Sequence, residues 1–164
     1  MHPRRLRHLW LMVLPAWLFS ELSVPRPSLA LQQDYEKAIL LDTTNITALH
    51  SRGSMHQRLG HPLQALADYN AAVALLGASG AGATDASCAF IFNSRGVLLQ
   101  AMGQLSQALP DFDAAVQLAP STAAFKRNRG QCRRATGDLA GAIVDFTQAI
   151  QQDPSDMMAH VQVR

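Results

Sequence analysis

The sequence predicts an all-α protein, a solenoid in which antiparallel helix pairs stack one after another. Three observations predict this class. A pattern of residues recurs at a spacing of 34 positions, small and apolar residues follow helical spacing within each unit, and glycine or proline marks the unit boundaries. A fixed period of this length is typical of a repeat made of two helices joined by a turn.

The repeat is clearest between residues 92 and 154, where equivalent positions hold the same residue types. These matches are Gly96 and Gly130, Gly103 and Gly137, Ala108 and Ala142, Asp111 and Asp145, Phe112 and Phe146, and Pro120 and Pro154. The small residues allow two helices to approach closely, and the phenylalanines fill the remaining space. The second glycine of each unit marks the turn, and the proline ends the second helix because it cannot continue one.

On these residues the chain resembles the tetratricopeptide repeat family, from about Leu31 to Asp156. The resemblance implies a right-handed superhelical solenoid. It also implies the usual role of the family, which is protein–protein binding.

We expect about three complete repeats within a solenoid at 31–164. The complete repeats are 46–79, 89–122 and 123–156, with partial repeats at 31–45 and 157–164. Gly53 and Gly96 are 43 residues apart, nine more than the period. The excess falls in a small, glycine-rich stretch at about 77–88, which predicts a flexible inserted loop.

Residues 1–30 do not fit the repeat. Arginines at positions 4, 5 and 7 precede an apolar run at 9–19, which is too short to span a bilayer and has the length of a signal-peptide core. Ser28 and Ala30 suit a cleavage site, whereas Pro15 interrupts the run. A signal peptide and a non-repeat helical segment therefore both remain as interpretations.

These two interpretations lead to different compartments. With a retained segment, the cytoplasm is favoured. A signal peptide would direct the chain to the secretory pathway, where Asn45-Ile46-Thr47 would be a glycosylation sequon.

Composition and motifs argue against catalysis, cofactors and nucleic acid. The chain has 164 residues, a net charge of +2 and a pI of about 8.8, which is too mildly basic to indicate nucleic-acid binding. Its six histidines form no HExxH motif, and its two cysteines form no CxxC motif. The glycine-rich stretch lacks a phosphate-binding motif. We therefore expect no enzyme activity, no metal, no cofactor and no transmembrane span.

Each complete repeat carries an arginine before its first glycine and an aspartate sixteen residues later. The three pairs are Arg52 and Asp68, Arg95 and Asp111, and Arg129 and Asp145. We expect these groups to pair between helices, within a repeat or with its neighbour. The alternative is independent solvation of both groups.

The family resemblance implies that the first helix of each repeat lines a concave groove. Counting from each glycine gives the candidate groove residues His50, Gln57, Arg58, Asn93, Gln100, Arg127, Asn128, Gln131 and Arg134. None is acidic, so we expect an extended ligand carrying carboxylates, held most strongly by Arg127 and Arg134. The alternative is an ordinary solvated helix face.

One branch of the family binds chaperones through a clamp for two carboxylates. The clamp positions here hold His50, Ser54, Ser94, Ala124 and Asn128, and none matches the clamp pattern. We therefore do not expect that specific activity.

The sequence favours a non-catalytic adaptor that presents a groove to a peptide or helix of a partner. The alternatives are an assembly module that stacks through its incomplete ends, and a fragment of a larger multidomain protein. Self-association would involve apolar faces expected around Tyr35 and Ile39 at one end, and around Ile143, Phe146 and Ile150 at the other.

Overall fold

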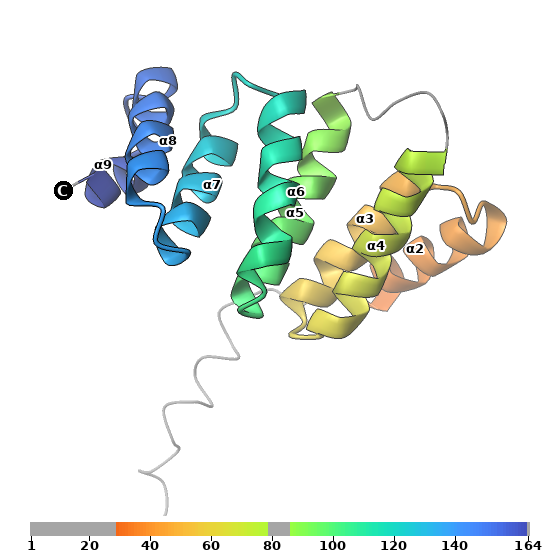
Figure 1. Ribbon diagram of the computed structural model, residues 1–164. Coiled ribbons are helices and arrows are strands. Elements are labelled where there is room, and N and C mark those ends of the chain that lie inside the picture. The colour runs from red at the N-terminus through yellow and green to blue at the C-terminus, as the bar shows by residue number, and fades with distance from the viewer. Residues whose placement is uncertain (1–28, 79–85, 164) are drawn as a thin grey trace, which may run out of the picture.

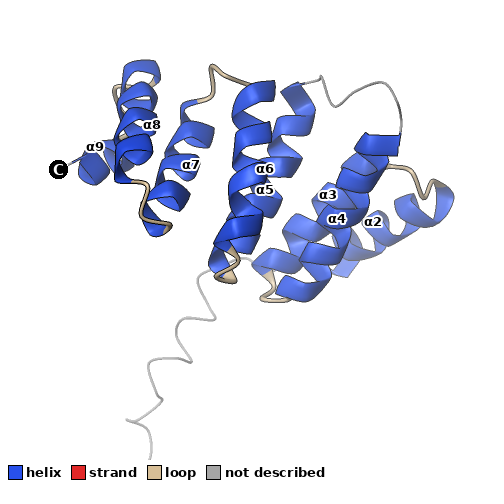
Figure 2. Ribbon diagram, in the orientation of Figure 1, coloured by secondary structure: helices blue, strands red, loops and turns tan. Residues whose placement is uncertain are grey.

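The computed structural model describes residues 29–78 and 86–163, and every regular element in those ranges is an α-helix (Figure 2). The helices are α2 (Leu29–Leu41), α3 (Ile46–Arg58), α4 (Pro62–Ala78), α5 (Ala86–Ala101), α6 (Leu105–Leu118), α7 (Ala123–Ala135), α8 (Leu139–Gln152) and α9 (Met157–Val163). The predictions made for residues 1–28 and for the centre of the inserted loop lie outside the described residues.

Successive helices form antiparallel pairs that stand in a row from α2 to α9 (Figure 1). The most extensive contacts join α3 to α4, α5 to α6 and α7 to α8, and each pair then packs on the next. This arrangement confirms the predicted all-α solenoid of helix pairs.

Helix extends into both ends of the predicted 77–88 loop. The helix α4 continues to Ala78, and α5 begins at Ala86. The glycine content suggested a longer loop, but Ala78 and Ala86 lie in these helical ends, and alanine has the highest helix propensity.

Each helix pair is held close by a buried glycine that faces a buried aromatic ring. A Cβ atom on any of these glycines would lie only 2.7–2.9 Å from a carbon of the ring. The pairs are Gly53 with Tyr69, Gly96 with Phe112, and Gly130 with Phe146. Close helix packing therefore depends on a small residue and a large ring at these two positions of the repeat.

The turn within each pair depends on a second glycine. Gly60, Gly103 and Gly137 have φ values of +77°, +76° and +90°, in the left-handed region. Glycine adopts this conformation without the steric cost that other residues incur. Each first helix therefore ends at a fixed point, and the second helix returns along it.

The expectation that Phe146 is exposed at the end of the solenoid is wrong. Its side chain is only 1% exposed, because the ring packs inside its own helix pair against Gly130. Ile143 on the same helix is 53% exposed, whereas Ile150 is partly buried. At the other end, Tyr35 and Ile39 are partly buried where α2 packs on α3.

Within the described residues, no helix combines the length and the apolar character needed to cross a membrane.

Candidate functional site

The first helices of the repeats lie on the inner side of the curved row. Helix α3 contacts α5, and α5 contacts α7, whereas no comparable contact joins α4 to α6 or α6 to α8 within the described residues. Because first helices approach one another more closely than second helices, the row curves toward them. The candidate groove residues lie on these helices: His50, Gln57 and Arg58 on α3, Asn93 and Gln100 on α5, and Arg127, Asn128, Gln131 and Arg134 on α7.

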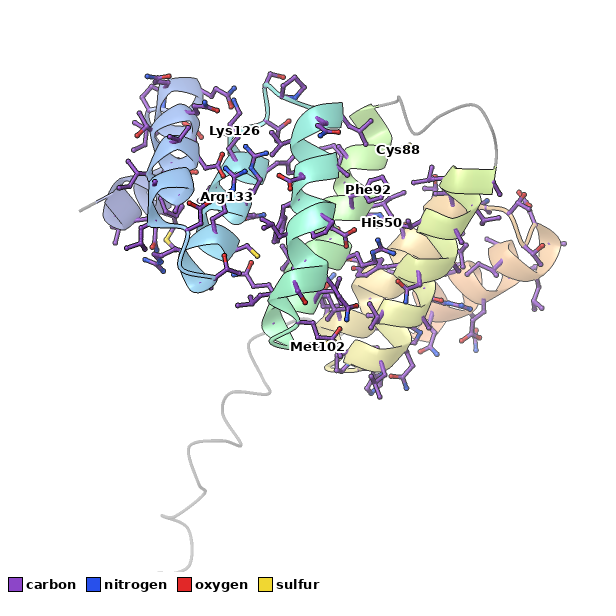
Figure 3. The ribbon with its side chains drawn as sticks, in the orientation of Figure 1. His50, Cys88, Phe92, Met102, Lys126 and Arg133 are labelled. Carbon is purple, nitrogen blue, oxygen red and sulfur yellow. The ribbon has the colours of Figure 1, made fainter. Side chains whose placement is uncertain are left out.

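Some of these residues join neighbouring first helices to each other. The Nε2 atom of His50 lies 3.0 Å from the Oγ of Ser94, where α3 faces α5 (Figure 3). One repeat further on, Asn128 Nδ2 donates to Asn93 Oδ1 at 2.8 Å. Both contacts link equivalent positions of successive repeats. We call these four residues the inner stripe, and their polar groups already have partners within the protein.

Arg127 also has a partner within the protein. Its Nη1 donates to Asp156 Oδ2 at 2.6 Å, and Asp156 is only 8% exposed. The other carboxylate oxygen of Asp156 accepts from the backbone N–H of Ala159, in the first turn of α9. Asp156 precedes α9 and lies outside the counted groove positions, so reasoning from the sequence missed this neighbouring carboxylate.

A second set of candidate residues remains open to ligand. Arg134 is exposed, and no hydrogen bond or ion pair joins its side chain to another described residue. Gln100 and Gln131 are partly exposed on α5 and α7. Gln57 accepts a hydrogen bond from the Tyr69 hydroxyl at 3.1 Å through Oε1, so its amide nitrogen is the group left for a ligand. We call these four residues, Gln57, Gln100, Gln131 and Arg134, the outer stripe.

A small cavity opens beside α3 where it meets α2. Its volume is about 180 Å³, and its lining residues are Leu31, Tyr35, His50, Ser51, Ser54, Met55 and Arg58. Of the α3 residues in this lining, His50 and Arg58 were predicted as groove residues from the sequence, whereas Met55 was not. Leu31 and Tyr35 were missed as site residues because they lie on α2, which corresponds to a second helix of the repeat.

Electrostatics differ between the cavity and the helix-pair interfaces. Burial lowers the pKa of His50 below its usual value, which favours the neutral imidazole. By contrast, the hydrogen bonds from Arg52 to Asp68 and from Arg129 to Asp145 raise the pKa of each arginine. The positive charge at neutral pH is therefore carried by arginines and not by His50.

The three arginine–aspartate pairs share one geometry. In each pair the arginine Nε and Nη2 atoms donate to the two carboxylate oxygens. The Nη2 to Oδ1 distance is 2.6 Å in all three, for Arg52 with Asp68, Arg95 with Asp111, and Arg129 with Asp145. Each bond pair joins the first helix of a repeat to the second helix of the same repeat.

Two of these arginines also contact the preceding repeat. Arg95 Nη1 donates to Asn70 Oδ1 at 3.0 Å, and Arg129 Nη1 donates to Asp113 Oδ1 at 3.0 Å. Asn70 and Asp113 occupy equivalent positions on α4 and α6. Each of these arginines therefore connects three helices, which identifies a role in the scaffold and not in the groove.

Neither metal binding nor thiol chemistry finds support among the described residues. No group of three or more His, Cys, Asp or Glu side chains there is arranged to hold a metal ion. Cys88 and Cys132 are both buried, and burial raises the pKa of the Cys132 thiol, which disfavours the reactive thiolate.

Comparisons with known proteins agree with this architecture. A family model described as tetratricopeptide repeat matches residues 94–156. A comparison with curated proteins found no match. Among solved structures, MamA aligns with a TM-score of 0.69 at 20% identity, over 80% of this chain and 72% of that chain.

Two further solved structures carry peptide binding in their descriptions. YrrB, described as a tetratricopeptide repeat protein with an unusual peptide-binding site, aligns with a TM-score of 0.68 at 23% identity, over 90% of this chain and 70% of that chain. The second tetratricopeptide repeat domain of human RPAP3, in complex with the HSP70 peptide SGPTIEEVD, aligns with a TM-score of 0.61 at 20% identity, over 70% and 88% of the two chains. At these identities the likeness concerns the fold alone.

Proposed function

We propose that this chain, which contains tetratricopeptide repeats, is a non-catalytic adaptor that binds an extended segment of another protein on its concave side. The outer stripe is the observation that carries this proposal. Gln57, Gln100, Gln131 and Arg134 place hydrogen-bonding groups along the inner side of the curve, and none of the candidate groove residues is acidic.

The chemistry of the outer stripe suits a peptide that carries carboxylates. The glutamine amides have both donors and acceptors, so they can bond a peptide backbone. Arg134 presents a planar guanidinium that can bind two carboxylate oxygens at once. Solved structures of similar fold hold the acidic peptides SGPTIEEVD and SRMEEVD. This supports the general class of ligand, whereas the unmatched clamp positions argue against those particular peptides.

Arg134 is the main cationic contact in this proposal. Arg127 lies seven residues earlier, on the same side of α7, but its guanidinium already binds Asp156. A ligand carboxylate gains less from Arg127, because it must compete with a carboxylate that is fixed in place. Electrostatic steering by these arginines makes the association rate fall as salt concentration rises.

Fluorescence anisotropy with two matched peptides tests the proposal. One labelled peptide contains three glutamates, and the other has glutamine at the same positions. We expect the acidic peptide to bind more tightly, and Arg134→Glu to remove most of the difference. Lys37→Glu is the matched control, because it makes the same charge change on an exposed part of α2. Equal binding of the two peptides, or loss in both variants alike, argues against a ligand contact at Arg134.

An assembly module is the second candidate function. Large apolar side chains are exposed near the C-terminal end of the row, on α8 and α9. They are Leu139 (60%), Ile143 (53%), Val144 (52%), Met158 (56%) and Val161 (65%). The first helix of a repeat in another copy could pack on this face as α7 packs on α6. Sedimentation velocity of the full chain separates the candidates, because stacking predicts a stable oligomer without ligand that Ile143→Asp dissociates.

A further inference from the structure

We propose that the cavity between α2 and α3 holds one large apolar side chain of the bound segment, of leucine or phenylalanine size. This inference rests on the adaptor function proposed above. It adds a specificity determinant: the ligand must carry an apolar anchor in addition to its carboxylates.

The size of the cavity fits one such side chain. Its volume is about 180 Å³. A cavity of about 150 Å³ can accept benzene, so this volume is sufficient for a phenyl or isobutyl group. Met55, only 3% exposed, and Leu31 and Tyr35 on α2 contribute apolar surface to its lining.

The polar part of the lining does not demand a charged occupant. Ser51 and Ser54 contribute hydroxyl groups, and the Nε2 atom of His50 is already bonded to Ser94. Burial lowers the pKa of His50, so the imidazole favours its neutral form. None of the described lining residues is acidic, and Arg58 is the arginine among them. An apolar anchor next to a ligand carboxylate therefore meets no repulsion.

The repeat explains why a cavity exists here. In the later repeats, Ser94 and Asn128 each contact a residue of the preceding first helix, His50 and Asn93 respectively. Ser51 is the equivalent residue on α3. The described helix before α3 is α2, which corresponds to a second helix of the repeat, so Ser51 lines the cavity and its side chain has no hydrogen-bond partner among the described residues.

The position of the cavity beside the outer stripe favours the bound segment as its occupant. Ser54 and Arg58 line the cavity and flank Gln57 of the outer stripe on α3. The cavity thus adjoins Gln57, the α3 member of the outer stripe, whose other members lie on α5 and α7. An extended segment can place its backbone along the glutamines and one side chain in the cavity.

A filling variant and matched peptides test the anchor. The probes are three labelled peptides with the same glutamates and with leucine, phenylalanine or alanine at one central position. On the unmutated full chain we expect the leucine and phenylalanine peptides to bind about tenfold more tightly than the alanine peptide. Ser51→Phe fills the cavity, and we expect this ratio to fall to about one. Ser106→Phe is the matched control, because Ser106 is exposed on α6.

The outcomes separate the anchor from the adaptor function. If the chain prefers acidic peptides but not the leucine peptide, or if Ser51→Phe keeps the preference, the anchor proposal is wrong and the adaptor proposal stands. If no peptide binds, both are wrong. Circular dichroism checks that Ser51→Phe is folded.

Crosslinking gives a second measurement that does not depend on the filled variant. A benzoylphenylalanine at the central peptide position should crosslink to Met55 or Leu31 of the unmutated chain. Crosslinks confined to other helices overturn the proposal. In a separate experiment without peptide, benzoylphenylalanine replaces Tyr35 of the chain itself, and its crosslinks identify any other occupant of the cavity. A link to residues before Leu29, or to a second copy, assigns the cavity to that occupant and also overturns the proposal.

Discussion

Replacing Arg95 with alanine leaves a buried aspartate without its counter-charge. The guanidinium donates to both oxygens of Asp111, at 2.8 and 2.6 Å, and to Asn70 at 3.0 Å. Asp111 is only 3% exposed. No second cation forms a salt bridge with it among the described residues. The substitution therefore removes the only described charge that stabilises this carboxylate.

The size of the effect follows from burial. Removing one partner of a buried ion pair costs about 3–5 kcal/mol. The Arg95 side chain is 21% exposed, so water already screens part of the interaction. We therefore expect Arg95→Ala to lower the free energy of unfolding by about 3 kcal/mol, the lower end of this range. This corresponds to a fall in Tm of roughly 6–12 °C for a chain of this size.

Arg129→Ala provides an internal comparison. Its aspartate, Asp145, is fully buried but also accepts a hydrogen bond from Arg133 at 2.9 Å. The remaining arginine keeps the carboxylate partly neutralised. We therefore expect a smaller loss than for Arg95→Ala, about 2 kcal/mol.

Urea unfolding followed by circular dichroism measures these losses. The set consists of Arg95→Ala, Arg129→Ala, Asp111→Ala and the double variant Arg95→Ala, Asp111→Ala. We expect the double variant to lose less than the sum of the single variants, because neither charge is left alone. A loss below about 1 kcal/mol for Arg95→Ala, as for an exposed pair, or a larger loss for Arg129→Ala, would refute this reasoning.

Three further predictions concern other parts of the fold. Gly96→Ala should destabilise by about 2 kcal/mol, because its Cβ would lie 2.9 Å from a buried ring. In contrast, a Cβ atom at Gly77 would meet nothing within 4 Å, so Gly77→Ala should increase the free energy of unfolding by up to about 1 kcal/mol. The urea midpoints of the two variants measure the difference, and equal effects contradict the packing argument. Asp156→Asn should release Arg127 and tighten binding of the glutamate peptide about fivefold, measured by anisotropy; unchanged affinity means that Arg127 does not reach the ligand. Burial lowers the folded-state pKa of His50, so the unfolded chain takes up the proton first as pH falls through the ordinary value of 6.5, and stability decreases there. His50→Gln should flatten the pH dependence of Tm below pH 6.5. An unaltered slope contradicts the prediction that protonation of His50 lowers stability.

The helix-pair architecture could be predicted from the sequence because its determinants are local and repeated. A small residue that faces a large ring recurs at a fixed spacing, as for Gly130 and Phe146, and a turn glycine separates the two helices. The tetratricopeptide repeat resemblance drawn from this pattern is confirmed by the family match over residues 94–156. The same pattern explains one error, because the ring that faces the glycine cannot also form the exposed end of the solenoid.

Two features of the candidate site could not be predicted in this way. The partner of Arg127 is Asp156, which lies in the segment between α8 and α9. The cavity depends on where Leu31 of α2 lies relative to α3. Both features depend on how one helix pair packs on the next. The repeat pattern carries little information on the distance and orientation between neighbouring pairs.

In the adaptor function that we propose, the pairing within the inner stripe limits what the concave side can bind. Asn93 and Asn128 bond each other across α5 and α7. A ligand that bonded either amide would have to break this contact and would gain little net free energy. The open groups instead lie at Gln100 and Arg134. Because the inner stripe ties the first helices together before any ligand arrives, the outer stripe is held in place, and binding costs less conformational entropy. Under the proposed function, the same contacts that engage four side chains within the protein therefore hold the remaining ones in place for a ligand.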